Sequence, residues 1–316
     1  MKKIVRNILR VILIVITVIA LFVIISLVRH KVCSSREKDL LTPLGELVEV
    51  NGHKMSVYTE GAGDKTLVFM SGGGTCSPIL DFKSLYSQLS NDYKIVVVEK
   101  FGYGFSDVVD ENRDIDTMLS ETRMALDKAG IKGPYVLCPH SMSGLEALYW
   151  AQKYPEEVEA IVGLDMAVPD YYDEMNINIP IMKLGQYGAA LGITRWIPSL
   201  AESDAIKAGT LSEKEKEIYR AVFYQKTATV TMIDEVKAVK QNANIVKENG
   251  IPQVPMLLFI SDGSGGTGFT KEKWRSIPEN YISGCDNARY IELDCPHYVH
   301  DYKYDEISKE IRKFIQ

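Results

Sequence analysis

The sequence predicts an α/β fold with one mostly parallel sheet, helices on both of its faces, and a helical segment inserted after the sixth strand. Two observations support this prediction. First, short, almost wholly apolar runs alternate with stretches of helical spacing; the runs are TLVFMS, KIVVVE, YVLC, EAIVGLD and VPMLLFIS. Such strands are typical of a parallel sheet covered by helices. Second, the alternation lapses between residues 169 and 250, where the pattern is helical without a clear strand.

The first two strands are predicted to form a hairpin. LVEV and KMSVYTEG flank Asn51-Gly52, a strong signal for a two-residue turn. The sheet would then continue through the apolar runs and end at ARYIELD. The core is therefore expected at residues 45–168 and 251–316, with the helical insertion at 169–250.

Helices are expected between the strands. ILDFKSLYSQLSND and LEALYWAQKY have helical spacing. Asp114–Gly130 is also predicted to be helical, with Gly130 as its stop signal and four apolar residues on one face, namely Ile115, Met118, Leu119 and Leu126. A last helix carries Ile307, Ile311, Phe314 and Ile315.

The N-terminus is predicted to be a membrane anchor. Val11–Val28 contains no charged residue, and Ile8 and Leu9 extend the run, so residues 8–28 are long enough to span a bilayer. A cleaved signal peptide would have a shorter apolar core and a small-residue cleavage site, which RHKVCSSREK lacks. Residues 1–7 form a short basic N-terminus and residues 29–44 a polar linker. The positive-inside rule slightly favours a single-pass protein with its large domain outside the cytoplasm.

Charge and cysteine content narrow the possible ligands. Residues 1–39 carry eight Lys and Arg against two Asp and Glu, which leaves 28 against 40 for the rest of the chain. An acidic body without a basic stripe argues against a nucleic-acid ligand. The five cysteines show no metal-ligand spacing, so no metal is expected, and free thiols are favoured over a Cys285–Cys295 pair. The sequence leaves the oligomeric state open.

Reactive side chains follow several of the predicted strands. Ser141 follows YVLC, Asp165 ends EAIVGLD, Asp262 follows VPMLLFIS, and His297 comes after ARYIELD. Ligands of an open parallel sheet bind at the carboxyl ends of its strands, so these residues should meet at one edge. A serine needs an imidazole to take its proton and an acid to orient that imidazole. The predicted catalytic residues are Ser141, His297 and Asp262, with Asp165 as the alternative acid.

His297 is preferred as the base because it lies in a loop that follows a strand. His300 would begin the last helix and is expected to pack nearby, and His140, next to the serine, should point elsewhere. The developing oxyanion of acyl transfer needs N–H donors. The Met142 amide at the start of a helix is one candidate. The second is Gly73 in SGGGT, with Gly74 as the alternative, because glycine allows close approach of the backbone.

Together these residues resemble the α/β-hydrolase superfamily over roughly residues 45–316. The resemblance rests on SGGGT, EKFGYGFSD, PHSMSG, SDG and CPHYVH in this order. Pro139 and Ser143 replace the glycines that usually flank the nucleophile, and Ser71 stands where a histidine usually precedes the oxyanion glycine. In EKFGYGFSD, Glu99 and Phe101 replace an aspartate and an arginine of the family turn.

The resemblance implies an α/β-hydrolase fold in which the insertion is a cap over the site. Its apolar residues are expected to pack the cap against the body or to line a substrate pocket; they are Met182, Leu184, Tyr187, Leu191, Trp196 and Ile197. The expected function is a membrane-anchored serine hydrolase of small carboxylic esters, without a cofactor. The alternatives are a serine aminopeptidase or other amide or lactone hydrolase, and a non-catalytic binding protein of the same fold. Epoxide hydrolases and haloalkane dehalogenases of the superfamily are disfavoured because they have aspartate at the elbow.

Overall fold

One eight-stranded sheet organises residues 2–316, which a computed structural model describes, with side chains from residue 3 onward. The strands lie in the order β1-β2-β4-β3-β5-β6-β7-β8, and only β2 runs antiparallel to its neighbours. Their bounds are β1 (Glu46–Val50), β2 (His53–Glu60), β3 (Thr66–Met70), β4 (Lys94–Glu99), β5 (Tyr135–Pro139), β6 (Val158–Leu164), β7 (Met256–Ile260) and β8 (Ala288–Glu292). The predicted fold class is confirmed.

Asn51 and Gly52 form the predicted hairpin turn between β1 and β2. Val50 pairs with His53, and the two turn residues have φ values of 52° and 82°. Positive φ at both positions is the conformation that Asn-Gly favours in a two-residue hairpin. This turn fixes the register of the hairpin from which the rest of the sheet continues.

Alternate residues of each strand enter two hydrophobic layers. In β3, Val68 and Met70 face one layer, whereas Leu67 and Phe69 face the other. Helices α4 (Ile115–Lys128), α5 (Ser143–Lys153) and α11 (Lys271–Ile282) cover the first layer. The second is covered by α2 (Pro78–Asp81), α3 (Lys83–Leu89), α12 (Val299–Tyr302) and α13 (Tyr304–Phe314). Burial on both faces explains why these strands are continuous apolar runs.

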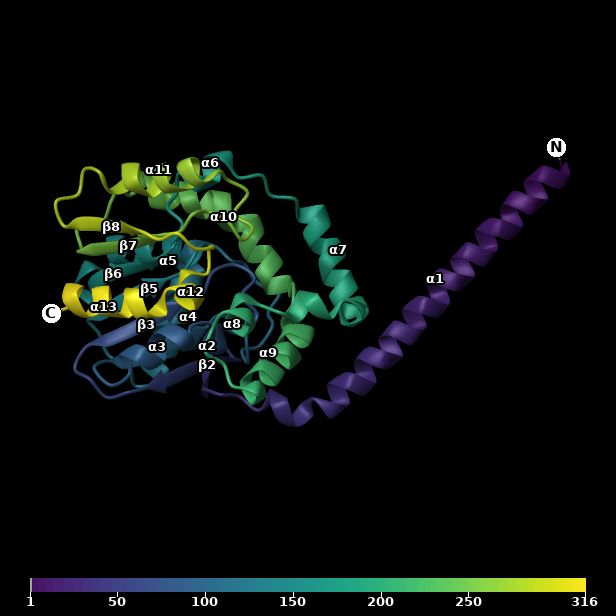
Figure 1. Cartoon of the computed structure of the whole chain (residues 1–316), viewed down its shortest axis with the longest axis horizontal. Helices are drawn as coiled ribbons and strands as arrows, with labels where there is room; N and C mark the ends of the chain where they lie inside the picture. Colours follow the sequence, from purple (N-terminus) through teal and green to yellow (C-terminus); the bar gives the residue numbers. More distant parts are fainter. Residues whose placement is uncertain (1) are drawn as a thin grey trace.

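The chain between β6 and β7 is helical, as the sequence predicts. It forms α6 (Tyr171–Glu174), α7 (Ile179–Ala190), α8 (Asp204–Lys207), α9 (Glu213–Lys226) and α10 (Val230–Glu248), together with short 3₁₀ turns that include η3 (Ile193–Trp196) and η4 (Pro198–Ala201). Helices α7, α9 and α10 lie on the side of the sheet from which the N-terminal helix leaves the body (Figure 1). We call residues 169–250 the cap.

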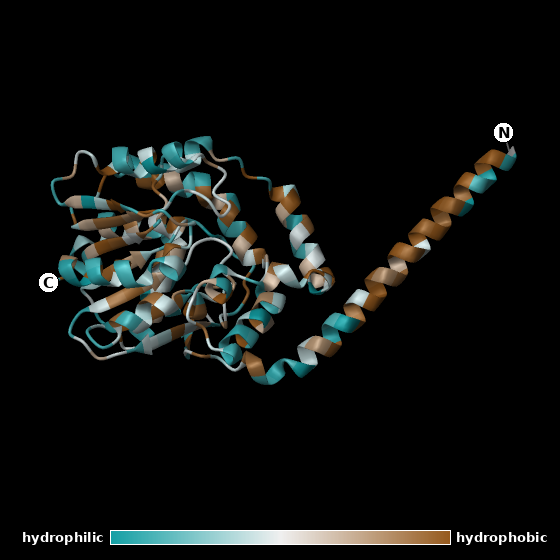
Figure 2. Ribbon diagram, in the orientation of Figure 1, coloured by the Kyte–Doolittle hydropathy of each residue, from teal (hydrophilic) through white to brown (hydrophobic). Residues whose placement is uncertain are grey.

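Helix α1 (Lys2–Arg36) projects away from the body and carries a nearly continuous apolar surface (Figures 1 and 2). It is long and apolar enough to cross a membrane, and N-terminal signal sequences share these two properties. The helix continues past residue 28 into the stretch where the sequence indicates a linker. The continuation packs on the cap, because Arg195 donates hydrogen bonds to Glu37 (2.6 and 2.7 Å) and His30 (3.0 Å).

Candidate active site

Ser141 stands on a sharp turn between β5 and α5. Its φ is 52°, a left-handed conformation that non-glycine residues seldom adopt. The turn is held on both sides, because the His140 amide donates to Met70 O (2.9 Å) and the Ala167 amide donates to Ser141 O (2.7 Å). A strained serine between a strand and a helix is the geometry of a nucleophile elbow.

Ser143 stands where the family usually has glycine, and its hydroxyl forms hydrogen bonds that hold the turn. Its hydroxyl lies 2.6 Å from Met70 O and 2.8 Å from His140 O, and it accepts a hydrogen bond from the His140 amide at 3.1 Å. The close backbone approach falls instead to Gly144, where an added Cβ would lie 2.1 Å from Ala167 O. The turn therefore keeps its shape with the glycine displaced by one residue.

His297 joins the serine to a buried carboxylate. Its Nε2 lies 2.9 Å from Ser141 Oγ, and its Nδ1 lies 2.5 Å from Asp165 Oδ2. The Asp165 contact implies that Nδ1 carries the proton, which leaves Nε2 to accept from the serine hydroxyl. Ser141, His297 and Asp165 thus form one hydrogen-bonded chain at the carboxyl edge of the sheet.

The preference for Asp262 as the acid next to the imidazole is corrected by this geometry. Asp262 accepts a hydrogen bond from the Ser264 amide at 2.8 Å, within its own loop. Neighbouring side chains of an extended segment point to opposite sides. Ser261, the first residue after β7, points its side chain toward the site and donates to Asp165. The side chain of the next residue, Asp262, therefore faces away. The carboxylate at the imidazole is the alternative acid, Asp165.

Asp165 is surrounded by donors. Its side chain is 2% exposed and accepts from the Ser261 amide (2.7 Å), the Ser261 hydroxyl (2.6 Å) and the Trp274 indole N–H (3.0 Å), in addition to His297. A buried carboxylate requires such compensation for its lost hydration. Ser261 and Trp274 are not among the residues that the sequence predicts for the site. The Ser-Asp pair after VPMLLFI favours its aspartate, and nothing local to Trp274 in α11 marks this contact.

His140 supports the loop that carries the imidazole. It is buried, and its Nε2 lies 3.2 Å from the backbone oxygen of His297. Burial, followed by the neighbouring His297 and His300, holds the pKa of His140 well below its usual value. A neutral His140 adds no positive charge beside the imidazole. His300 is also buried, with Nε2 3.7 Å from Asp81 Oδ2, so it does not enter the chain of three residues.

The glycine turn lies against the elbow. An added Cβ at Gly72 would lie 2.6 Å from the Cβ of Ser141, and one at Gly73 would lie 2.7 Å from the Met142 side chain. The Gly74 amide already faces the Tyr103 hydroxyl at 3.4 Å. Gly73 and Met142 therefore lie next to each other beside the serine, and the position of Gly74 makes it the less suitable second donor.

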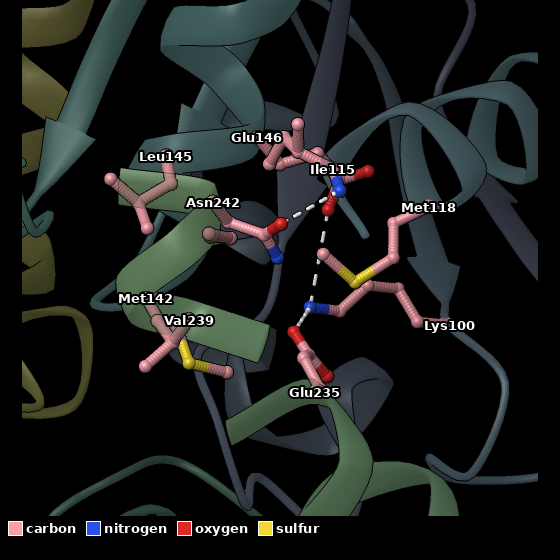
Figure 3. A pocket seen from close by; sticks show the side chains of 10 residues that line it. Lys100, Ile115, Met118, Met142, Leu145, Glu146, Glu235, Val239 and Asn242 are labelled. Atoms are coloured by element: carbon pink, nitrogen blue, oxygen red, sulfur yellow. Dashed lines mark hydrogen bonds and ion pairs between the residues drawn. The ribbon is translucent and has the colours of Figure 1, made fainter. Parts of the chain in front are cut away.

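A small cavity lies behind the elbow, between helices α4, α5 and α10 (Figure 3). Its volume of about 10 Å³ is close to what one water molecule needs. Lys100 forms an ion pair there with Glu235 of α10, and Glu146 Oε2 of α5 lies 3.9 Å from the same ammonium group. Burial raises the pKa of Glu146. The charged residues around this cavity link α5 to α10 of the cap. The cavity itself is too small to hold an ester substrate.

Three of the residues predicted to line an apolar pocket are exposed on the surface. Leu184, Tyr187 and Trp196 are 72%, 62% and 44% exposed, and they lie on the outside of the cap. Met182 and Leu191 are half-buried, and neither lines the cavity behind the elbow. The helical spacing of these residues gave no information about which side of the cap they face.

Comparison with known proteins agrees with this architecture. No protein-family model matches the chain. The uncharacterized protein YbdG of Bacillus subtilis is 35% identical over 320 residues, and the alignment covers 98% of each chain. An α/β hydrolase fold protein from Burkholderia ambifaria superposes with a TM-score of 0.64 at 15% identity, covering 86% of this chain and 98% of the other.

The chain therefore belongs to the same family as YbdG, and its fold is the α/β-hydrolase fold. An enol-lactonase from Burkholderia xenovorans is another structural neighbour, with a TM-score of 0.62, 17% identity, and 85% and 99% of the two chains covered. At this identity the likeness concerns the fold. In this fold, the glycine turn follows β3, the serine follows β5 and the acid follows β6, so all three lie at one edge of the sheet, and the segment after β8 brings the histidine to the same edge.

Proposed function

We propose that the protein is a membrane-anchored serine hydrolase that cleaves carboxylic esters through an acyl-enzyme. The observation that carries the proposal is the chain from Ser141 Oγ through His297 to Asp165, with distances of 2.9 and 2.5 Å. The distance of 2.9 Å from Ser141 Oγ to His297 Nε2 is within reach for proton transfer, and the short contact with Asp165 orients the imidazole. The superfamily is consistent with this chemistry but does not select it, because one fold supports many reactions.

In the acylation step, Ser141 Oγ attacks the ester carbonyl carbon while its proton passes to His297 Nε2. The carbonyl oxygen becomes an oxyanion, which the amides of Met142 and Gly73 would stabilise. Asp165 keeps the proton on Nδ1 and stabilises the imidazolium. When the tetrahedral intermediate collapses, the bond to the alkoxide breaks, and the imidazolium returns its proton to the leaving alcohol.

Deacylation repeats the sequence with water as the nucleophile. His297 Nε2 takes a proton from the water as its oxygen attacks the acyl carbon. The second intermediate expels Ser141 Oγ, which regains a proton from the imidazolium and releases the carboxylic acid. A neutral His140 suits this cycle, because a fixed positive charge nearby would oppose formation of the imidazolium.

Helix α1 would hold this enzyme at the membrane. Its apolar stretch is long enough to span a bilayer, and its basic N-terminus favours a cytoplasmic start with the catalytic body on the opposite side. The long apolar run and the absence of an A-x-A-like site support an uncleaved anchor.

Labelling with a fluorophosphonate probe tests the proposed nucleophile. The wild-type protein should label, and Ser141→Ala should not. Ser120→Ala is the matched control, because it removes an exposed hydroxyl on α4, and it should retain labelling. Absence of labelling in the wild type, or equal labelling of Ser141→Ala, would refute the serine mechanism.

A panel of short esters, long esters, lactones and amides would then define the substrate. Lactones belong in the panel because an enol-lactonase shares the fold. Turnover of esters above amides is the expected result. A preference for amides with a free amino terminus would instead support the aminopeptidase alternative.

A further inference from the structure

The outer surface of the cap is unusually apolar. Six of the ten large hydrophobic side chains exposed outside α1, among the described residues, lie between residues 181 and 200. We call them the apolar cap surface: Ile181, Leu184, Tyr187, Trp196, Ile197 and Leu200. Their exposed fractions run from 44% to 72%. The other four lie singly on distant elements, as scattered surface apolar residues do in most proteins.

The charge of this segment differs from that of the rest of the body. Residues 175–200 contain no Asp or Glu, although the whole chain has 42 of them. The two charged residues in the segment are Lys183 and Arg195. Arg195 is buried and paired with Glu37, which leaves Lys183 as the exposed charge. A surface that is apolar, free of acids and bears an exposed lysine has the composition of an interfacial membrane-binding element.

The cap touches α1 inside the stretch proposed to span the membrane. The Trp196 indole donates a hydrogen bond to Ser26 Oγ at 3.1 Å, and its ring lies 5.5 Å from that of Phe22. On its other side, the Arg29 guanidinium lies 4.5 Å from the ring centroid. Trp196 therefore spans the boundary between the apolar stretch and the basic residue that follows it.

The rise per residue of an α-helix gives the depth of these contacts within the apolar stretch. At about 1.5 Å per residue, Ser26 lies about 3 Å and Phe22 about 9 Å inside the end of the stretch at Val28. Amphipathic helices at membrane surfaces are immersed by about 5–10 Å. A bilayer that surrounds α1 as far as Val28 therefore reaches the cap at η3, where α7 ends.

Helix α7 continues the same surface. Ile181, Leu184 and Tyr187 are spaced three residues apart and so share one face. The opposite side of the helix packs on α10 and includes the buried Ala189. In Figures 1 and 2, α7 stands at the edge of the body nearest to α1, with brown apolar segments along it.

We propose that the apolar cap surface is immersed in the outer layer of the bilayer that holds α1. The occupant of the surface is therefore lipid, with Lys183 and Arg29 at the level of the headgroups. This inference rests on the proposed membrane anchoring by α1 and adds a second point of contact. Two contacts fix how the catalytic body is oriented on the membrane.

Quenching by brominated lipids tests the depth of α7. The full chain would be placed in phosphatidylcholine–phosphatidylglycerol nanodiscs, with a tryptophan introduced by Leu184→Trp in a Trp196→Phe background. The matched control is Tyr290→Trp in the same background, because Tyr290 is also exposed (45%) but lies on β8. Trp150 and Trp274 are buried and contribute equally to both proteins.

Brominated acyl chains should remove about half of the emission added by Leu184→Trp and leave that of Tyr290→Trp nearly unchanged, since an interfacial element reaches the acyl boundary. Both variants should retain the thermal unfolding of the wild type. Equal quenching in the two variants, or protection of Leu184→Trp that depends on protein concentration, overturns the proposal; the second result would assign the surface to another copy of the chain.

The anchor is tested separately by alkaline carbonate extraction of membranes that contain the intact chain. Protein that stays in the membrane while Leu184→Trp is not quenched refutes only the cap contact. Protein that is extracted, or that has lost residues 1–28 by intact mass, refutes the anchor and the cap contact together. Fluorophosphonate labelling is independent of both results, so the catalytic proposal stands or falls on its own.

Discussion

Ser141 and Asp165 hold left-handed backbone conformations, with φ values of 52° and 50°. Such conformations cost of order 1–3 kcal/mol in non-glycine residues and tend to collect at functional sites. Here the strain has a visible result. Each residue follows the end of a strand, and the turn directs its side chain toward His297 instead of along the sheet. The rest of the fold must therefore stabilise two unfavourable positions that face each other across one imidazole.

Exchange of the acid tests the corrected assignment at the residue scale. Asp165→Asn should lower kcat on an activated ester by about 10³- to 10⁴-fold, because the imidazole loses its orienting carboxylate and the correct tautomer. Asp262→Asn is the matched control and should stay close to the wild type, since the Asp262 side chain accepts its hydrogen bond within its own loop. Loss of activity in Asp262→Asn alone would restore the original preference.

The sequence was sufficient to place the serine, the histidine and both candidate acids at one edge, because each follows a strand. It was not sufficient to choose between Asp165 and Asp262. That choice depends on a positive φ at Asp165 and on which of Ser261 and Asp262 faces inward, and neither leaves a local pattern. The donors to Asp165 are also non-local, since Trp274 lies 109 residues away in the chain.

At the scale of elements, close packing of α5 against the segment after β6 sets the elbow. Gly144 is the contact point, and an added Cβ there would lie 2.1 Å from a backbone oxygen. Backbone cannot yield as a flexible side chain does, so α5 would have to move and carry the Ser141 turn with it. The position of Ser141 therefore depends on a residue without a side chain.

A pair of glycine substitutions tests this dependence. Gly144→Ala should destabilise the protein by several kcal/mol or displace the elbow, so that fluorophosphonate labelling is lost. Gly185→Ala in α7, where nothing lies within 4 Å, should instead stabilise by up to about 1 kcal/mol through helix propensity. Chemical denaturation measures both. Comparable effects of the two substitutions would contradict the packing argument.

The EKFGYGFSD loop supplies a pH-dependent element. Burial raises the pKa of Glu99 from 4.5 to about 7. Its Oε2 accepts the Phe105 amide at 2.8 Å, and Gly104 packs directly on the carboxyl group. A raised acid pKa means that the native state binds more protons than the unfolded state, so this group lowers stability as the pH rises from about 4.5 to about 7.

Glu99→Gln should remove this dependence of stability on pH. The variant should be more stable than the wild type at pH 8, by up to ~3 kcal/mol, and the difference should shrink toward pH 5. Denaturant unfolding at several pH values measures it, with the exposed Glu248→Gln as control for the loss of one charge. A difference that does not vary with pH would rule out Glu99 as its source.

At the scale of the whole molecule, the contact between the end of α1 and the cap places the helix relative to the body. We call this contact the joint. Arg195 is only 4% exposed on its side chain and bonds to His30, Ser34 and Glu37 of the N-terminal segment. Its guanidinium also lies 4.2 Å from the ring centroid of Tyr224. One side chain of the cap thus holds the end of α1 against the body.

Arg195→Ala should release this joint. Amide hydrogen exchange of residues 29–41 should rise about tenfold or more, since loss of a largely buried ion pair costs more than 1.4 kcal/mol. Arg220→Ala is the matched control, because it breaks a more exposed ion pair with Glu202 on the same cap. Unchanged exchange at residues 29–41 in Arg195→Ala would show that other contacts hold the joint.

The same joint marks the limit of prediction for the overall architecture. Alternating apolar runs and Asn51-Gly52 were enough to predict the sheet, its hairpin and the helical insertion, because each leaves a local signal. The polar residues after Val28 suggested a linker, but α1 continues to Arg36, and Arg195 of the cap contacts this continuation. The apolar residues of α7 suggested a pocket, because helical spacing looks alike whether the face meets a substrate, the body or lipid.

Because α1 continues as a helix up to the cap, the body has little freedom to move away from the membrane in the proposed anchored protein. A flexible linker over residues 29–44 would let the catalytic body wander by about 20 Å from the membrane. With α1 helical to Arg36 and fixed to the cap, that freedom is lost. In the proposed anchored enzyme, the serine stays at one height and moves only as fast as the protein diffuses in the plane. Its effective substrate concentration is then that of a thin layer over the lipid, which favours substrates that partition into the membrane surface.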